Sequence, residues 1–188
     1  MYLIKQLVKS FRMKKKTKLL AMKYSTSRLI VAEDSKSNSG ELFDEICSIL
    51  SPEVTVSLPS GWSNINTREK ANVWLEARKS EGTVLFVHHK ELKRVVGFIF
   101  LYNMDNNSAR TDYRFGYLLA QEVWGNGLGT ELIKGLIDAC KREGTINSVS
   151  GGVERNNGAS IRVLEKIGFV SSKEDVPSKE TLFFRYQF

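Results

Sequence analysis

Cysteine and histidine are scarce in this sequence of 188 residues, and long apolar runs are absent from it. The two cysteines, Cys47 and Cys140, are far apart and lack the spacing of a metal site, so free thiols in a reducing, cytoplasmic compartment are expected. The two histidines, His88 and His89, are adjacent, and on a strand they would point to opposite faces. No apolar run approaches the roughly 18 residues of a membrane-spanning helix. The sequence therefore predicts a cytoplasmic protein without a metal site or a transmembrane helix.

The net charge of +7 belongs to one segment rather than to the whole chain. Residues 1–23 contain eight lysines and arginines and no acidic residue. Subtracting these eight charges from +7 leaves −1 for the remaining residues. A nearly neutral body does not favour a basic groove for nucleic acid, and specific DNA binding is not expected.

Residues 1–23 form a basic leader whose apolar residues also recur at helical spacing. This pattern is typical of a short amphipathic helix, which could contact a membrane, RNA, a ribosome or another protein through residues 1–21. The leader lacks the long apolar core and the cleavage site of a signal peptide. The alternative is an extension of little consequence, with Met22 as the natural start. Residues 24–188 are predicted to form one domain.

Beyond the leader, strand and helix patterns alternate. Strands rich in β-branched and aromatic residues are predicted at 27–33, 83–89, 94–102, 109–119, 146–153 and 181–188. Helices are predicted at 40–50, after an N-cap at Thr67, at about 129–143, and at 159–167 before Gly168. Residues 51–62, which contain prolines and a glycine, are predicted to be a loop. Short connections make the second, third and fourth strands an antiparallel meander, and the whole pattern predicts an α+β domain with a mixed sheet.

The segment 124–130 reads WGNGLGT and directly precedes a predicted helix. A P-loop would need a lysine after its glycines, and none follows here. A dinucleotide fingerprint that starts at Gly125 would need a glycine where Thr130 stands, and an acidic residue about twenty residues further on is also missing. The glycines also fit a turn that binds a pyrophosphate through backbone N–H groups and the helix dipole. The pattern alone does not separate this interpretation from a simple tight turn.

A second motif, NNGASIRVLEKIGF at 156–169, follows in an order that resembles the GNAT acyltransferases. WGNGLGT resembles their Q/R-x-x-G-x-G/A loop, and the second motif resembles N-x-x-S-x-x-x-x-E-K-x-G-F. TSRLIVAE at 26–33, WLEAR at 74–78 and FGYLL at 115–119 resemble the Rim-type branch, which includes enzymes that acetylate the N-terminal amines of ribosomal proteins. The resemblance covers residues 26–188. It implies a mostly antiparallel sheet that splays to hold acetyl-CoA, with helices on both sides and no metal.

The resemblance also implies where acetyl-CoA would lie. The splay is expected between the strands 94–102 and 109–119. N–H groups of the second strand would then pair with the pantetheine arm like an added strand. Asn157 resembles the asparagine that bonds the pantetheine, and the alternative is a helix N-cap. The expected strand contacts are Tyr117, Leu118 and Leu119. The expected pyrophosphate contacts are Gly125, Asn126, Gly127, Leu128, Gly129 and Thr130.

The implied reaction moves an acetyl group to a primary amine, either a small molecule or a protein N-terminus. A backbone N–H near Leu118 or Leu119 would polarise the thioester carbonyl. Many relatives place a tyrosine acid where this chain has Leu164, whereas Rim-type relatives use a serine at the position of Ser160. Ser160 is therefore the candidate acid, and the alternative is a small residue that packs against the loop.

The general base is not assigned by these motifs. Relatives often carry a glutamate where this chain has Arg114. Asp112 on the same strand face could act through a water, although Arg114 would hold its charge, and Glu69 is another option. Because of these departures, a non-catalytic CoA-binding or ribosome-associated module is the alternative to an enzyme.

Overall fold

The structure is a computed structural model, and it describes residues 22–33, 40–56, 58–59, 61–104, 110–172 and 180–188. The predicted helix of the leader falls within residues 1–21 and lies outside the described residues. Cys47 and Cys140 are free thiols. None of the described helices combines the length and the apolar character of a membrane-crossing segment.

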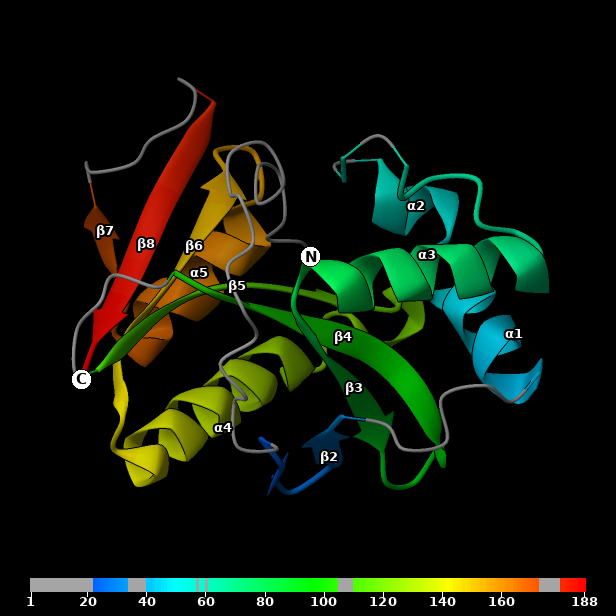
Figure 1. Cartoon of the computed structure of the whole chain (residues 1–188). Helices are drawn as coiled ribbons and strands as arrows, with labels where there is room; N and C mark the ends of the chain where they lie inside the picture. The colour runs from blue at the N-terminus through cyan, green and yellow to red at the C-terminus, as the bar shows by residue number, and fades with distance from the viewer. Residues whose placement is uncertain (1–21, 34–39, 57, 60, 105–109, 173–179) are drawn as a thin grey trace.

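One mixed sheet of eight strands organises the described chain, in the order β1-β2-β3-β4-β5-β6-β8-β7 (Figure 1). Every neighbouring pair is antiparallel except β5 and β6, which are parallel. The predicted strands are confirmed as β2 (Leu29–Ala32), β3 (Thr83–His89), β4 (Arg94–Asn103), β5 (Thr111–Leu119), β6 (Ile146–Glu154) and β8 (Thr181–Gln187). Two short strands were not predicted, β1 (Tyr24–Ser25) and β7 (Val170–Ser172). The predicted α+β class with a mostly antiparallel sheet is confirmed.

The predicted helices are confirmed as α1 (Gly40–Ile49), α3 (Arg68–Glu81), α4 (Leu128–Glu143) and α5 (Gly158–Ile167). Thr67 is the N-cap of α3, because its side chain accepts a hydrogen bond from the backbone N–H of Lys70 at 3.3 Å. Gly168 ends α5 in the left-handed conformation, with φ of 101°. The prediction of a loop throughout 51–62 is wrong, since Pro52–Thr55 form the short helix α2. Proline suits the first turn of a helix, where its missing N–H costs nothing.

Helices cover both faces of the sheet (Figure 1). On the face of α1, α2 and α3, Trp74 packs edge-on against Phe98 and Phe100 of β4, with ring centroids 5.4 and 6.1 Å apart. On the other face, α4 and α5 bury the alternate residues of β5, so that Tyr117 contacts Ser160. The two faces of β5 therefore belong to different layers, and this separation positions the site.

Candidate donor-binding site

A gap opens between β5 and β6. The two strands pair in parallel from Thr111 with Ile146 to Arg114 with Ser150, and the pairing does not extend beyond Arg114. β6 instead pairs with β8 along seven consecutive positions. The prediction that β4 and β5 splay apart is wrong, because these two strands pair without interruption from Asn103–Tyr113 to Gly97–Leu119. β4 and β5 form one continuous antiparallel ladder, whereas β5 and β6 are joined by a crossover through α4 and are free to diverge.

The register of β4 with β5 determines which backbone groups face this gap. The N–H of Ala120 donates to the carbonyl of Val96 at 2.8 Å, so Ala120 is directed toward β4. Alternate residues of an antiparallel strand point their backbone groups to opposite sides. Leu118 is therefore directed toward β4, whereas Tyr117 and Leu119 direct their N–H and C=O groups toward the gap. Of the three predicted backbone contacts, Tyr117 and Leu119 are the two that lie on the side of β6.

Trp124 joins the end of β5 to the glycine segment. Its indole Nε1 donates a hydrogen bond to the carbonyl oxygen of Leu119 at 2.8 Å. The ring is partly buried and packs against the core. Trp124 therefore fixes the segment against the strand edge that faces the gap. The sequence motif did not indicate this role, because relatives carry Gln or Arg at the corresponding place.

Two glycines of the segment 124–130 require the left-handed backbone region. Gly125 and Gly127 have φ of 77° and 76°, a conformation that residues with a Cβ rarely adopt. Gly127 is also the N-cap of α4, so no side chain caps the first turn of this 16-residue helix. The N–H groups of that turn and the positive end of the helix dipole form a ready site for an anion.

Arg28 supports the loop from outside. Its Nη1 donates to the carbonyl oxygen of Asn126 at 3.0 Å, and its Nη2 forms an ion pair with Glu131 of α4 at 2.7 Å. Glu131 also accepts hydrogen bonds from Thr26 Oγ1 at 2.6 Å and from the backbone N–H of Arg28 at 2.7 Å. Burial alone would raise the pKa of Glu131, but the hydrogen bonds from Thr26 and Arg28 lower it below its ordinary value. The segment before β2 therefore holds the loop in place.

A hollow of about 280 Å³ lies beside the loop. It contains most of the predicted pyrophosphate contacts, whereas Asn126 turns its carbonyl oxygen to Arg28. Arg162 and Lys166 of α5 line the opposite side, and residues four apart lie on the same face of a helix. Lys166 is the lysine of the second motif and Arg162 stands at one of its unspecified positions, but a binding role was predicted for neither. The lining residues are Leu119, Val123, Trp124, Gly125, Gly127, Leu128, Gly129, Thr130, Ala159, Arg162, Val163 and Lys166.

Asn157 and Ser160 lie at the start of α5. Asn157 Oδ1 accepts a hydrogen bond from the N–H of Ser160 at 3.1 Å, which is an N-cap contact. Ser160 is fully buried, and the hydroxyl of Tyr117 donates to its Oγ at 3.3 Å. Burial raises the pKa of Tyr117 well above its ordinary value, and the contact with Ser160 only partly offsets this effect. The result is a buried pair of protonated hydroxyls beside the gap.

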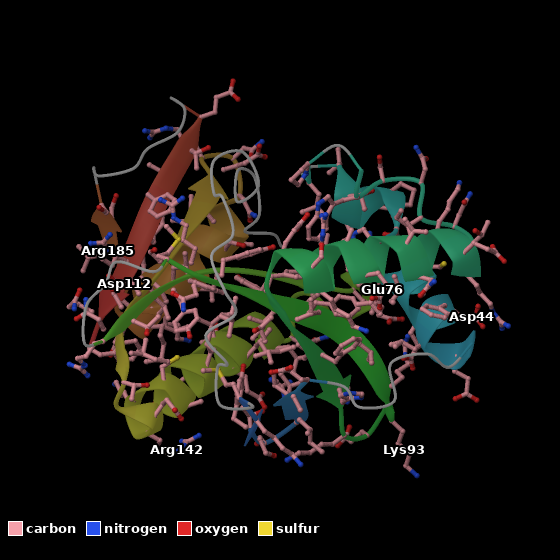
Figure 2. All side chains as sticks on the ribbon, in the orientation of Figure 1. Asp44, Glu76, Lys93, Asp112, Arg142 and Arg185 are labelled. Atoms are coloured by element: carbon pink, nitrogen blue, oxygen red, sulfur yellow. The ribbon has the colours of Figure 1, made fainter. Side chains whose placement is uncertain are left out.

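The two candidate bases lie on different elements, and each has hydrogen-bond partners of its own. Asp112 lies where β5 and β6 are still paired, and it accepts hydrogen bonds from Asn147 Nδ2 at 2.9 Å and Ser148 Oγ at 2.6 Å (Figure 2). Glu69 is exposed in the first turn of α3, where a hydrogen bond from its own backbone N–H and a contact with Thr67 lower its pKa. Arg114 places its guanidinium over the ring of Phe183 in β8, 5.1 Å from the centroid.

No three His, Cys, Asp or Glu side chains gather closely enough to hold a metal ion within the part of the chain that the structure describes. The arrangement is instead one for an extended anionic ligand. It provides backbone groups along β5, an uncapped helix N-terminus and two cations on α5.

Solved acetyltransferases share this architecture. The GNAT-family acetyltransferase from Bacillus anthracis superimposes with a TM-score of 0.68 at 16% identity, over 88% of this chain and 98% of the other. The ribosomal-protein-S5-alanine acetyltransferase from Vibrio fischeri gives a TM-score of 0.61 at 14% identity, over 88% of this chain and 96% of the other. At these identities the likeness is one of fold, and the fold is that of the GNAT acetyltransferases.

The chain belongs to the GNAT acetyltransferase family, because the family model described as "Acetyltransferase (GNAT) domain" matches residues 38–170. The "Probable N-acetyltransferase YjcK" of Bacillus subtilis is 31% identical over 86 residues, which are 46% of this chain and 46% of YjcK. The chain spans less than half the length of the curated relatives that it matches.

Proposed function

We propose that the protein is an N-acetyltransferase that moves an acetyl group from acetyl-CoA to a primary amine by direct attack in a ternary complex. The observation that carries this proposal is one continuous path: the gap beside Tyr117 and Leu119, the left-handed glycines, and the cations of α5. An extended anionic thioester fits such a path, because each part of it offers hydrogen-bond donors or positive charge.

The residues present fit the phosphates and the pantetheine arm of acetyl-CoA. The N–H groups in the first turn of α4, together with Gly125 and Gly127, suit the pyrophosphate. Arg162 and Lys166 suit the remaining phosphate charge. The backbone groups of Tyr117 and Leu119 suit the amides of the pantetheine arm, and Asn157 lies at the other side of the gap as the N-cap of α5.

Two groups of this chain would act on the thioester. A backbone N–H of β5 that faces the gap, that of Tyr117 or Leu119, is the candidate that polarises the carbonyl oxygen, since the backbone of Leu118 is directed toward β4. Ser160 is the candidate that gives a proton to the departing thiolate, with the hydroxyl of Tyr117 behind it to replace that proton.

The acceptor in this proposal is a primary amine, either a protein N-terminus or a small molecule. The motifs shared with the Rim-type branch favour a protein N-terminus such as that of a ribosomal protein. We also propose that residues 24–188 act as one domain, since a single sheet runs from Tyr24 to Gln187, and that the basic leader adds contact with a ribosome, RNA or a membrane.

A thiol-release assay tests the proposal. The protein is incubated with acetyl-CoA and a panel of amines that includes peptides with free serine or alanine N-termini, while free thiol is measured. Amine-dependent thiol release supports an enzyme. Binding of CoA by calorimetry without turnover on any amine would favour the alternative, a non-catalytic CoA-binding or ribosome-associated module.

A further inference from the structure

Buried polar atoms without a hydrogen-bond partner gather at the C-terminal end of α3. Six such side-chain atoms occur among the described residues, and four of them are Trp74 Nε1, Arg78 Nε, Glu81 Oε2 and Tyr102 Oη. Buried polar groups are ordinarily hydrogen-bonded, and an exception calls for an explanation such as a ligand or a catalytic role. We call Trp62, Trp74, Arg78, Glu81 and Tyr102 the Glu81 cluster.

Direct contacts connect the members of the cluster. Arg78 Nη2 forms an ion pair with Glu81 Oε1, and the side chains are only 11% and 22% exposed. The guanidinium of Arg78 lies 4.7 Å from the ring centroid of Trp62, whose ring packs edge-on against Trp74 at 5.3 Å. One carboxylate oxygen of Glu81 is therefore fixed by Arg78, while the other is left for a different donor.

The cluster lies beside β4, one strand away from the closed end of the gap between β5 and β6. The end of α3 touches β4 there, since a Cβ on Gly82 would come within 3.0 Å of the ring of Tyr102. Tyr102 pairs across the ladder with Arg114, and Arg114 is the last residue of β5 that pairs with β6. In Figure 1 the C-terminal end of α3 leads directly into β3, the neighbour of β4 in the sheet.

The length of the gap matches the length of the donor. Arg114, at the closed end, lies five positions before Leu119, which is beside the glycine segment. At roughly 3.3 Å per residue this is about 16 Å, a span suited to an extended pantetheine arm. A thioester near Tyr117, three positions from Arg114 and beside Ser160, would therefore lie toward the closed end, on the side of the Glu81 cluster.

We infer that Glu81 is the catalytic base that takes a proton from the acceptor amine, an inference that rests on the proposed function. Glu81 is a partly buried carboxylate beside Tyr102, one strand from the closed end of the gap, whereas Asp112 is held by Asn147 and Ser148 and Glu69 is exposed at the opposite end of α3. Glu81 thus supplies from α3 the carboxylate that β5 lacks at Arg114.

The proton and electron movements balance. The Glu81 carboxylate takes one proton from the ammonium group, and the lone pair of the neutral amine forms a C–N bond to the thioester carbon. The C–S bond breaks and its electron pair leaves with sulfur. Tyr117 replaces the proton that Ser160 gives to the sulfur, and the second amine proton restores the hydroxyl of Tyr117. Glu81 finally releases its proton to water, so that one proton is produced for each amide formed.

The surroundings of Glu81 suit this role. Burial raises its pKa, and the charge and hydrogen bond of Arg78 only partly offset that effect, which moves the carboxylate toward the range of an effective base. The charged and titratable groups that face it are Arg78 of α3 and Tyr102 of β4. Burial and the charge of Glu81 raise the pKa of Tyr102, so its hydroxyl stays protonated and can donate.

The same cluster indicates the chemical class of the acceptor. Glu81 Oε2 can accept a hydrogen bond from an amine, whereas Trp74 Nε1 and Arg78 Nε are donors. An amine with a neighbouring oxygen that accepts hydrogen bonds would satisfy both kinds of atom. The N-terminal amine of a peptide, followed by its first carbonyl group, has this arrangement.

The experiment compares Glu81→Gln, Glu81→Asp and the control Glu76→Gln. Glu76 lies on the same helix, but it is exposed and pairs with Lys79 at 3.1 Å (Figure 2). The probe is a short peptide with a free N-terminal alanine, or whichever amine of the panel is acetylated if that peptide is not. The readouts are kcat/KM from about pH 6 to pH 9.5, the Kd of acetyl-CoA, and Tm.

Glu81→Gln is expected to lower kcat/KM about 100-fold or more near neutral pH, with the Kd of acetyl-CoA unchanged within about twofold. The deficit should shrink as pH rises, because solvent then deprotonates the amine. Glu81→Asp should retain the pH dependence of the wild type at a reduced rate, and Glu76→Gln should behave as the wild type.

Two results would overturn the inference. One is a Glu81→Gln variant whose pH profile equals that of Glu76→Gln. The other is a loss that is the same at every pH and accompanies weaker acetyl-CoA binding and a lower Tm, which indicates a structural role. A wild-type protein that binds acetyl-CoA and acetylates no amine would instead remove the proposed function, and this inference with it.

Discussion

The hydroxyl of Tyr117 on β5 donates a hydrogen bond to Oγ of Ser160 on α5 at 3.3 Å, and both side chains are fully buried. This contact joins the strand that borders the gap to the helix that carries the second motif. It also places two exchangeable protons in series at the point where a thiolate would leave.

Ser160→Ala is expected to lower kcat by about 100-fold, at the lower end of the range for general acids because a thiolate is already a stable leaving group. Tyr117→Phe should cause a smaller loss. Because the pKa of Tyr117 is raised, no fall in kcat from this pair is expected between neutral pH and about pH 10. Steady-state rates and the Kd of acetyl-CoA check this, with exposed Ser25→Ala as the control. An unchanged kcat in Ser160→Ala would mean that Ser160 only packs against the loop.

Arg162→Ala and Lys166→Ala are each expected to weaken CoA binding roughly tenfold, since a hydrogen bond to a charged group contributes about 1.5–3 kcal/mol and these side chains are partly solvated. The loss should be smaller at high salt, because salt screens charge. Arg142→Ala is the matched control, since Arg142 is an exposed arginine at the far end of α4 (Figure 2). Equal affinities of all three variants for CoA in calorimetry would remove α5 from the donor site.

Gly127→Glu is expected to weaken CoA binding strongly, because a carboxylate at this position would crowd and repel the pyrophosphate. Gly144→Glu is the matched control. Gly144 caps the opposite end of α4, it also has a positive φ, and a Cβ there would meet open space. Both variants should lose some stability from backbone strain, and Gly144→Glu should lose no less, because a negative charge is unfavourable at a helix C-terminus. CoA affinity that is unchanged in Gly127→Glu would contradict the assignment of the loop.

Glu131→Gln should lower stability at neutral pH, and the deficit should shrink as pH falls below the ordinary pKa of a glutamate and through the folded-state pKa of Glu131. The folded-state pKa of Glu131 lies below its ordinary value of 4.5, so its ionised form adds stability above that value, and this contribution is lost as pH falls through the folded-state pKa. The charged hydrogen bonds with Thr26 and Arg28 suggest a loss of about 1–3 kcal/mol at neutral pH. Urea unfolding over a series of acidic to neutral pH values measures this difference, and a difference that is constant with pH would exclude the ionised contact. CoA binding should also weaken, because Arg28 would hold Asn126 less firmly.

The main helices and strands could be predicted from the sequence because each is long enough to show the hydrophobic periodicity of its type. α2, β1 and β7 have only two to four residues, so pairing and packing decide their structure. The position of the splay could not be predicted from local pattern. It depends on β6 leaving β5 to pair with β8, whose paired residues lie between 27 (Glu154 with Thr181) and 39 (Ser148 with Gln187) positions further along the chain.

Some residues of the candidate site could likewise be predicted from the sequence, and others could not. The role of Gly125 and Gly127 could be predicted from the sequence, because it depends on the left-handed backbone conformation that glycine readily adopts. Trp124 and Glu81 act through neighbours that the fold brings to them, and neither carries a local signal. Arg162 and Lys166 are an intermediate case. Their four-residue spacing on a predicted helix could be read from the sequence, but the sequence did not show that this helix faces the glycine segment.

The most direct test of the central claim is a single assay of the full chain with acetyl-CoA and the amine panel, in which free thiol and product mass are measured together. The account predicts one thiol released for each amine that gains an acetyl group. CoA binding with neither thiol release nor an acetylated product would contradict it.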